Sequence, residues 1–233
     1  MNVDSYKLIL RGFLDAGYEA RFFNEKHGDN KSIFLRHDID FDVKYAYEMS
    51  RVEDKLNIKS TYFFLLHSKS YNLLESDNIA LIKLMMSNGH HIGIHFDPTL
   101  YNDIEQGFNR ERLLFENVFN IKIDCVSIHR PSEYFLNNKE NICGVMHTYN
   151  PIYFSDMKYF SDSSGCFKYG HPLESEEFKN RKTIQLLTHP IWWMTTKDGS
   201  ISKLNEFLES RNNKYKKHVA RNCIPYKEYL DDK

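Results

Sequence analysis

Short apolar runs alternate along this chain with longer stretches that carry apolar residues at helical spacing. Runs of four to six residues that are apolar almost throughout are typical of strands buried on both faces of a sheet. They predict strands at residues 32–35, 61–66, 92–96, 124–128 and 183–187, with a short extended segment at 152–154. Apolar residues three or four apart predict helices at residues 6–16, 41–56, 79–86, 101–119 and from 201 onward.

Strands that alternate with helices favour a parallel sheet, either open or closed into a barrel. The 233 residues contain no linker rich in Pro, Gly or Ser and no internal repeat, so we expect residues 1–233 to form a single α/β domain. Residues 133–177 are less regular and are expected to form loops over one face of the sheet, where α/β enzymes carry specificity.

Charge and composition narrow the function classes. The net charge is −1, so no global field attracts the protein to nucleic acid or acidic membranes, and the basic run at residues 211–217 is predicted to be a solvated helix end. No apolar run reaches the ~18–20 residues that span a bilayer, and the first residues lack the pattern of a signal peptide. The four cysteines are widely spaced and form no Cys-x-x-Cys pair. These features predict a cytoplasmic, thiol-reduced protein and leave the oligomeric state open.

Residues capable of chemistry follow four of the predicted strands, at the carboxyl ends where α/β folds place their ligands. In chain order they are His37, Asp38 and Asp40, then His95 and Asp97, then His129 and Arg130, and finally His189. Two carboxylates one residue apart are costly without a cationic partner, and a divalent metal is the simplest one. The alternative is that Asp40 or Asp42 caps the helix that begins near residue 41. A lone histidine is more often a core or rim residue than a ligand, but four strands that end this way favour a shared site.

The order of these pieces resembles the five motifs of the polysaccharide deacetylases, carbohydrate esterase family four, also called the NodB-homology fold. The matching pieces are His37-Asp-Ile-Asp40, Gly89-His-His-Ile-Gly-Ile-His95, Arg130-Pro131, Asp162 and Leu187-Thr-His189. The resemblance implies a distorted (β/α) barrel of about seven parallel strands and metal-dependent removal of an acyl group from a sugar. The longer forms of the motifs around His37, His95 and His189 resemble a subgroup that is linked to bacterial gene clusters for surface polysaccharide and lipopolysaccharide.

The resemblance also implies roles for single residues. Asp38 would be the general base, Arg130 the side chain that orients it, and His189 the general acid. An aspartate near the floor of the site completes the set, and Asp162 is the candidate. The expected substrate contacts are Asp162, Trp192 and Trp193. The two tryptophans follow the last motif directly, and they suit a sugar platform and the hydrophobic core equally well.

The metal ligands implied by the resemblance are Asp40 and His95. The second histidine of the family's metal motif falls here at Thr99, so the third ligand must differ. Alternate residues of an extended strand point to one side, which makes Asp97 the expected third ligand. This mixture of nitrogen and oxygen donors suits a divalent metal, with zinc as the expected ion.

Three functions stay open on the sequence. The first is a metal-dependent N-deacetylase or other amide hydrolase that acts on a nucleotide-linked or lipid-linked sugar. The second is a non-catalytic carbohydrate-binding or scaffold protein of the same fold, and the third is a hydrolase of small amides. Metal content separates the first from the second, and substrate preference separates the first from the third.

Overall fold

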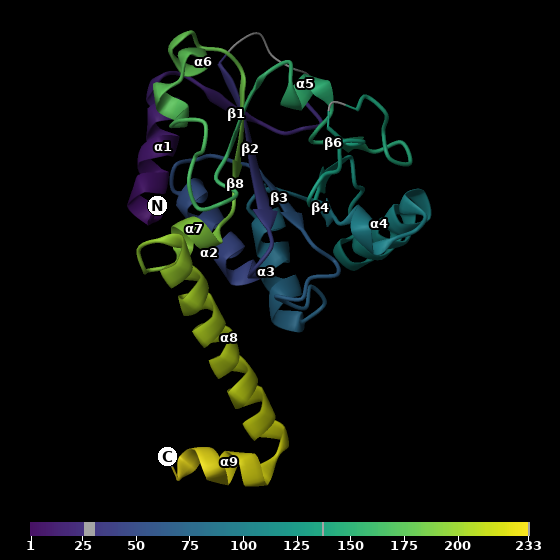
Figure 1. The fold of residues 1–233 in the computed structure, drawn as a ribbon, viewed down its shortest axis with the longest axis vertical. Coiled ribbons are helices and arrows are strands. Elements are labelled where there is room, and N and C mark those ends of the chain that lie inside the picture. The colour runs from purple at the N-terminus through teal and green to yellow at the C-terminus, as the bar shows by residue number, and fades with distance from the viewer. Residues whose placement is uncertain (26–30, 137, 233) are drawn as a thin grey trace.

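A parallel sheet curled into a half-barrel forms the centre of the protein (Figure 1). The computed structural model describes residues 1–25, 31–136 and 138–232. Seven strands pair in the order β6-β5-β4-β3-β2-β8-β7, and β1 pairs with β2 beside this path. The strands are β1 (Glu19–Arg21), β2 (Ser32–Ile39), β3 (Thr61–Phe64), β4 (His91–Phe96), β5 (Cys125–Ile128), β6 (Met146–His147), β7 (Lys158–Ser161) and β8 (Ile184–Thr188). The predicted fold class, a distorted α/β barrel of about seven parallel strands, is confirmed.

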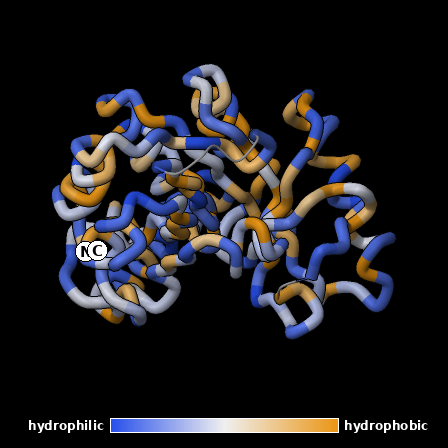
Figure 2. The backbone as a smooth tube through the Cα atoms, turned by 90° about the horizontal axis from the view of Figure 1, so that it is seen from above, coloured by the Kyte–Doolittle hydropathy of each residue, from blue (hydrophilic) through white to orange (hydrophobic). Residues whose placement is uncertain are grey.

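Helices surround this sheet, and each of the longer ones lies close to a predicted range. They are α1 (Val3–Asp15), α2 (Val43–Asp54), α3 (Ser76–Ser87), α4 (Ile104–Phe119), α8 (Ser200–Asn222) and α9 (Ile224–Asp231). Shorter helical segments are η1 (Pro98–Leu100), α5 (Pro151–Phe154), η2 (Pro172–Glu174), α6 (Glu176–Lys179) and α7 (Ile191–Met194). Figure 2 shows apolar and polar stretches alternating around the periphery, as expected when one face of each helix packs on the sheet.

Two kinds of local prediction were wrong. Residues 152–154 are helical rather than extended, because Pro151 stands at the first helical position and Asn150 caps the turn by accepting a hydrogen bond from Ile152 N. The sequence pattern also missed β1, β6 and β7, which have only three, two and four residues. Strands this short carry too few alternations to be distinguished from loops.

Strand β2 is the central element and is longer than its apolar run. It was predicted to end at Leu35, but it continues to Ile39 with all eight residues buried. It pairs with β3 on one side and β8 on the other, so the backbone groups of Arg36, His37 and Asp38 are held in the ladder despite their polar side chains. Because side chains alternate along a strand, Arg36 and Asp38 share one face and His37 faces the other.

A buried carboxylate, Glu53 of α2, ties this helix to the second face of β2. It accepts hydrogen bonds from Ser60 Oγ at 2.6 Å, from Tyr62 OH at 2.7 Å and from Tyr6 OH, and His37 Nε2 lies 2.8 Å from its Oε1. Burial by itself raises the pKa of Glu53, but the charge of His37 and these hydrogen bonds lower it to about 2. The carboxylate therefore remains charged inside the protein.

The last long helix, α8, projects from the body (Figure 1). Its first turns are anchored by the buried Lys203 and Phe207, whereas residues 212–219 are exposed. The basic run at residues 211–217 is solvated as predicted, but it lies in the middle of α8 rather than at a helix end. Among the described residues, no helix is long and apolar enough to cross a membrane.

Replacing Glu53 by Ala should lower the free energy of unfolding in urea by about 3–5 kcal/mol, because it leaves His37 and three hydroxyl groups buried without their partner. Glu48→Ala, on the same helix but half exposed, is the control and should cost less than about 1 kcal/mol. A folded-state pKa below the ordinary 4.5 stabilises above pH 4.5, so the difference between wild type and Glu53→Ala should shrink as the pH falls toward 2. Equal losses in the two variants would contradict this assignment.

Candidate functional site

A cavity of about 340 Å³ opens at the carboxyl ends of the central strands. Its polar lining residues are Asp38, Asp40, His95, His129, Arg130, Tyr149, Tyr159, Ser161, Ser163 and His189. The structure therefore brings together six of the strand-end residues selected from the sequence, namely Asp38, Asp40, His95, His129, Arg130 and His189. Parallel neighbouring strands create this convergence, because β5, β4, β3, β2 and β8 all end at the same edge of the sheet.

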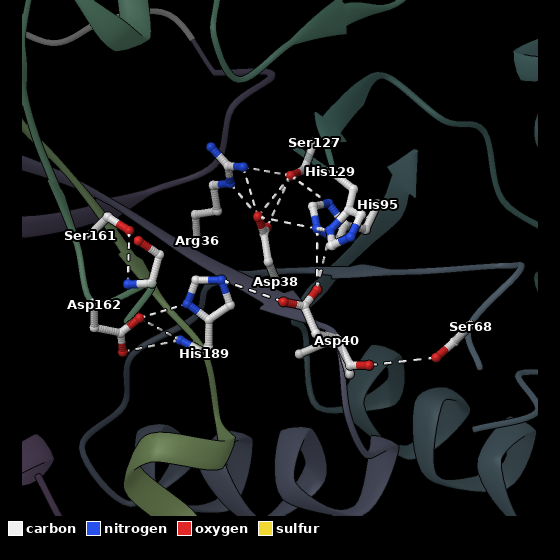
Figure 3. A network of polar contacts seen from close by, with 12 residues as sticks. Arg36, Asp38, Asp40, Ser68, His95, Ser127, His129, Ser161, Asp162 and His189 are labelled. Atoms are coloured by element: carbon white, nitrogen blue, oxygen red, sulfur yellow. Dashed lines mark hydrogen bonds and ion pairs between the residues drawn. The ribbon is translucent and has the colours of Figure 1, made fainter. Parts of the chain in front are cut away.

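Three potential metal-binding atoms meet in this cavity (Figure 3). His95 Nε2 lies 3.3 Å from Asp40 Oδ1, His129 Nδ1 lies 3.0 Å from His95 Nε2, and His129 Nδ1 lies 3.6 Å from Asp40 Oδ1. Zinc bonds of roughly 2.0–2.1 Å at tetrahedral angles place neighbouring ligand atoms about 3.3–3.4 Å apart. The observed spacing and the mixture of two imidazoles with one carboxylate thus fit a divalent ion such as zinc.

The protonation states of these residues also suit a metal ligand set. Burial and the nearby charge of His95 lower the pKa of His129, which favours the neutral imidazole that binds metal. Burial raises the pKa of Asp40, but its hydrogen bond and charge interaction with His95 outweigh burial and lower it.

Asp42, not Asp40, caps α2 by accepting from Lys44 N at 2.9 Å. The capping alternative therefore applies to Asp42 and leaves the Asp40 carboxylate to the cavity.

The third side chain of this cluster is His129 rather than Asp97, the expected third ligand. The Asp97 carboxylate turns away into a local cap, where Oδ1 accepts from Thr99 Oγ1 at 2.6 Å and from Thr99 N at 3.0 Å. His129 follows β5, which pairs with β4, and its N–H donates to Phe96 O at 2.7 Å. The sequence identified His129 as a strand-end residue, but only the adjacency of β4 and β5 reveals that it faces His95.

Ser127 links His95 to Asp38. Its Oγ lies 2.9 Å from His95 Nδ1 and 3.0 Å from both carboxylate oxygens of Asp38. If Nε2 of His95 binds metal, its Nδ1–H donates to Ser127 Oγ and the hydroxyl hydrogen is free to donate to Asp38. Such outer hydrogen bonds fix the ring orientation of a metal ligand. Ser127 was not selected from the sequence, and its position in a four-residue apolar run carries no signal of this role.

The guanidinium that holds Asp38 comes from Arg36 rather than from the predicted Arg130. Arg36 donates to both Asp38 oxygens, from Nε at 3.0 Å and from Nη2 at 2.7 Å. Both side chains are buried. Burial raises the pKa of Asp38, but the charges of Arg36, His95 and His189 and the Arg36 hydrogen bonds together outweigh burial and hold the pKa well below its usual range. Arg130 lines the cavity with a positive φ of 50°. Arg36 and Asp38 are two residues apart and therefore lie on the same face of β2, which is the sequence signal for this contact.

His189 follows β8 beside Asp38 of the neighbouring strand and is held by Asp162. Asp162 accepts from His189 Nδ1 at 2.6 Å and from its backbone N–H at 3.0 Å. Burial by itself lowers the pKa of His189, but the hydrogen bond and charge of Asp162, together with the charge of Asp40, raise it to about 9. The imidazole is therefore protonated at neutral pH, with Nε2 directed toward Asp40 Oδ2 at 3.8 Å.

The three predicted substrate contacts are buried instead. Asp162 is fully inaccessible, and it lies near the floor of the site as the motif order implied. Trp193 donates from Nε1 to Asp162 Oδ2 at 2.6 Å, and Trp192 packs in the core at 6.3 Å from the ring of Phe41. Trp193 thus orients the aspartate that holds His189, and neither indole forms a platform for a sugar. The core alternative for the two tryptophans is the correct one.

No family model matches the chain, and no curated protein matches it. Among solved structures it is similar to a CE4 family pseudoenzyme from Bacillus anthracis, a polysaccharide deacetylase from Bacillus cereus and the catalytic domain of a peptidoglycan N-acetylglucosamine deacetylase from Eubacterium rectale. The identities are 14%, 16% and 16%, and the TM-scores are 0.44, 0.45 and 0.45. The matches cover 81%, 78% and 83% of this chain and 63%, 87% and 89% of those chains.

The chain spans less than two thirds of the length of the pseudoenzyme. Similarity at these values describes the course of the backbone and carries nothing about activity.

Removing the His129 imidazole should weaken zinc binding by at least about 100-fold, because a direct ligand contributes more than the outer hydrogen bonds that cost 10–100-fold. Asp97→Ala is the matched control and should bind zinc as tightly as wild type. Competition with a chelating dye measures both affinities. Tight binding by His129→Ala together with loss in Asp97→Ala would restore the original assignment of the third ligand.

The Asp162→Asn substitution should lower the pKa of His189 from about 9 toward the ordinary 6.5, since it removes both the negative charge and the charge-assisted hydrogen bond. NMR titration of the His189 imidazole in metal-free protein measures this shift without an activity assay. The control is Asp156→Asn, at an exposed position, which should leave the titration unchanged. An unshifted titration in Asp162→Asn would show that Asp162 does not set the charge of His189.

Proposed function

We propose that this chain is a metal-dependent hydrolase that removes an N-acyl group, in the simplest case acetyl, from an amino sugar. The spacing of Asp40, His95 and His129 is the observation that carries the proposal, because it suits a divalent ion at the wall of a cavity. The order of the sequence motifs supports the same reaction. A volume of about 340 Å³ suits a small ligand such as one sugar ring with its acyl group, since small-molecule sites span roughly 300–1,000 Å³.

A divalent metal held by Asp40, His95 and His129 would supply a Lewis acid for the amide carbonyl. Amide hydrolysis then needs a proton taken from the attacking water and a proton given to the departing nitrogen. Asp38 is ionised beside the ligand set, and its partners Arg36 and Ser127 hold it in a fixed orientation. It would accept the proton of water as the new C–O bond forms.

His189 suits the second proton transfer. Asp162 binds Nδ1 and leaves Nε2 facing the cavity, and the raised pKa supplies the proton at neutral pH. Donation from Nε2 to nitrogen as the C–N bond breaks releases a free amine and a carboxylate. Strands β2 and β8 are adjacent, with His37 opposite Thr188, so Asp38 and His189 stand side by side at the ends of neighbouring strands.

One observation favours a second candidate, a non-catalytic carbohydrate-binding protein. The double hydrogen bond from Arg36 stabilises the charged form of Asp38 so strongly that it becomes a weak proton acceptor. A general base is most effective when its pKa lies near the working pH. A chain that retained this fold for binding alone would tolerate such a carboxylate.

The cellular role belongs to the proposal as well. The motif forms near His37, His95 and His189 support a task in bacterial surface-polysaccharide assembly. The substrate would then be a nucleotide-linked or lipid-linked amino sugar handled in the cytoplasm. A hydrolase of small amides is the remaining alternative within the same chemistry.

Zinc-loaded protein should release acetate from a nucleotide-linked N-acetylated amino sugar, measured by a coupled acetate assay. Asp38→Asn and His189→Ala should each lower the rate by about 10²–10⁴-fold with metal retained, because each removes one proton-transfer step. Asp156→Asn serves as the control and should match wild type. Chelation should abolish the rate and zinc should restore it.

Two results would contradict the proposed reaction. Binding of an acetylated sugar without acetate release, in fully loaded protein, would favour the carbohydrate-binding alternative. Acetate or ammonia release from small amides, but from none of the acetylated sugars tested, would favour the small-amide hydrolase.

A further inference from the structure

A run of positive charge without acidic residues lies near one end of the chain. Residues 211–227 contain six Lys or Arg and no Asp or Glu, although the whole chain has a net charge of −1. The remaining residues are therefore acidic overall, and the whole-chain value hides the asymmetry. Opposite charges that are separated along a chain in this way create a local field.

This basic segment lies on a helical arm, defined here as residues 211–232 of α8 and α9. Figure 1 shows α8 extending away from the sheet, with α9 turning across its end. At 1.5 Å per residue, the 23 residues of α8 reach about 35 Å. An ion pair of 3.2 Å between Lys214 and Glu75 ties the arm to the body. The arm thus presents most of its surface to solvent.

The same helix carries an exposed apolar stripe. Ile201, Leu208 and Tyr215 follow one another at seven-residue spacing and hence share one face of α8, which Val219 continues. All four side chains are exposed. Aligned apolar side chains of this kind are typical of a surface that binds a partner, since water contact is unfavourable for each of them.

A groove between the end of α8 and α9 combines cations with apolar side chains of its own, on the face of α8 opposite the stripe. It encloses about 540 Å³ and is lined by Lys217, Ala220, Arg221, Ile224, Lys227, Leu230 and Asp231. Three cations surround an apolar floor with one carboxylate among them. Ile224 is 71% exposed at this floor, and Tyr229 of the same helix is also exposed. The lining chemistry suits a ligand that is anionic on one side and apolar on the other.

We propose that the arm docks on the surface of an anionic phospholipid bilayer. Lys217, Arg221 and Lys227 would contact headgroup phosphates, while Ile224 enters the boundary of the acyl chains. Basic amphipathic helices bind in this way, lying in the interface plane without crossing it. No described helix can span a membrane, which agrees with an interfacial position. The inference is independent of the proposed reaction.

The two other candidate partners fit less well. A second copy of the chain would bring two sets of like charges together if the arms packed on each other, and like charges repel. A nucleic acid would satisfy the cations but would leave the exposed Ile224 in water. A bilayer surface covers the cations and the apolar floor of the groove at once.

The test is co-sedimentation of the full chain with vesicles of phosphatidylcholine alone and of equal parts phosphatidylcholine and phosphatidylglycerol. Wild type should bind only the anionic vesicles, and binding should weaken as salt screens the charges. Lys217→Gln, Arg221→Gln and Lys227→Gln combined should weaken binding on the order of 100-fold, because each of the three cations contributes roughly five-fold to lipid binding. Ile224→Ser should weaken it as well, since the apolar side chain no longer enters the interface.

The matched control combines Lys55→Gln, Lys69→Gln and Lys83→Gln, three exposed lysines outside the arm, and should bind like wild type. Equal thermal melting of both triple variants shows that the fold is retained. Three results would overturn the proposal: wild type that ignores anionic vesicles at low salt, an arm variant that binds as well as the control, or tighter binding to a DNA duplex than to the vesicles. A dimer in solution that the arm variant abolishes would assign the arm to a second copy.

Discussion

The buried ion pair between Arg36 and Asp38 is the interaction on which the site depends. Both residues stand in the middle of the sheet, where an unpaired charge would cost several kcal/mol. Two parallel hydrogen bonds compensate that cost, and Ser127 extends them to His95. One strand therefore positions the charged floor of the cavity, and the adjacent strands attach the remaining groups to it.

The acidic side chains around the cavity are kept apart by having different partners. Asp38 is held by Arg36, Asp40 faces the imidazoles of His95 and His129, and Asp162 is hydrogen-bonded to His189. Separate partners push the protonation states in opposite directions, so a carboxylate stays ionised while a nearby imidazole stays protonated. A pair of groups with opposed protonation is the arrangement that acid–base chemistry requires.

The opposite face of β2 is polar as well. His37 points away from the cavity toward Glu53, and its Nδ1 lies 2.7 Å from Thr188 Oγ1 on the neighbouring strand. Thr188 directly precedes His189, so the hydrogen bonds behind the sheet reach the strand that carries this imidazole. The two networks share the backbone of β2 and β8, which makes their geometry mutually dependent.

The sequence by itself determined the α/β class, the central strands and the group of strand-end residues that meet in the cavity. It succeeded there because apolar periodicity and residue order are local properties of the chain. Only the tertiary structure decided which side chains touch, since contacts depend on strand adjacency and on which way each carboxylate turns. His129 replaced Asp97 because β5 lies beside β4, and Arg36 replaced Arg130 because β2 continues past its apolar run. The basic residues after 211 became an exposed arm because α8 leaves the body, a direction that no local pattern encodes.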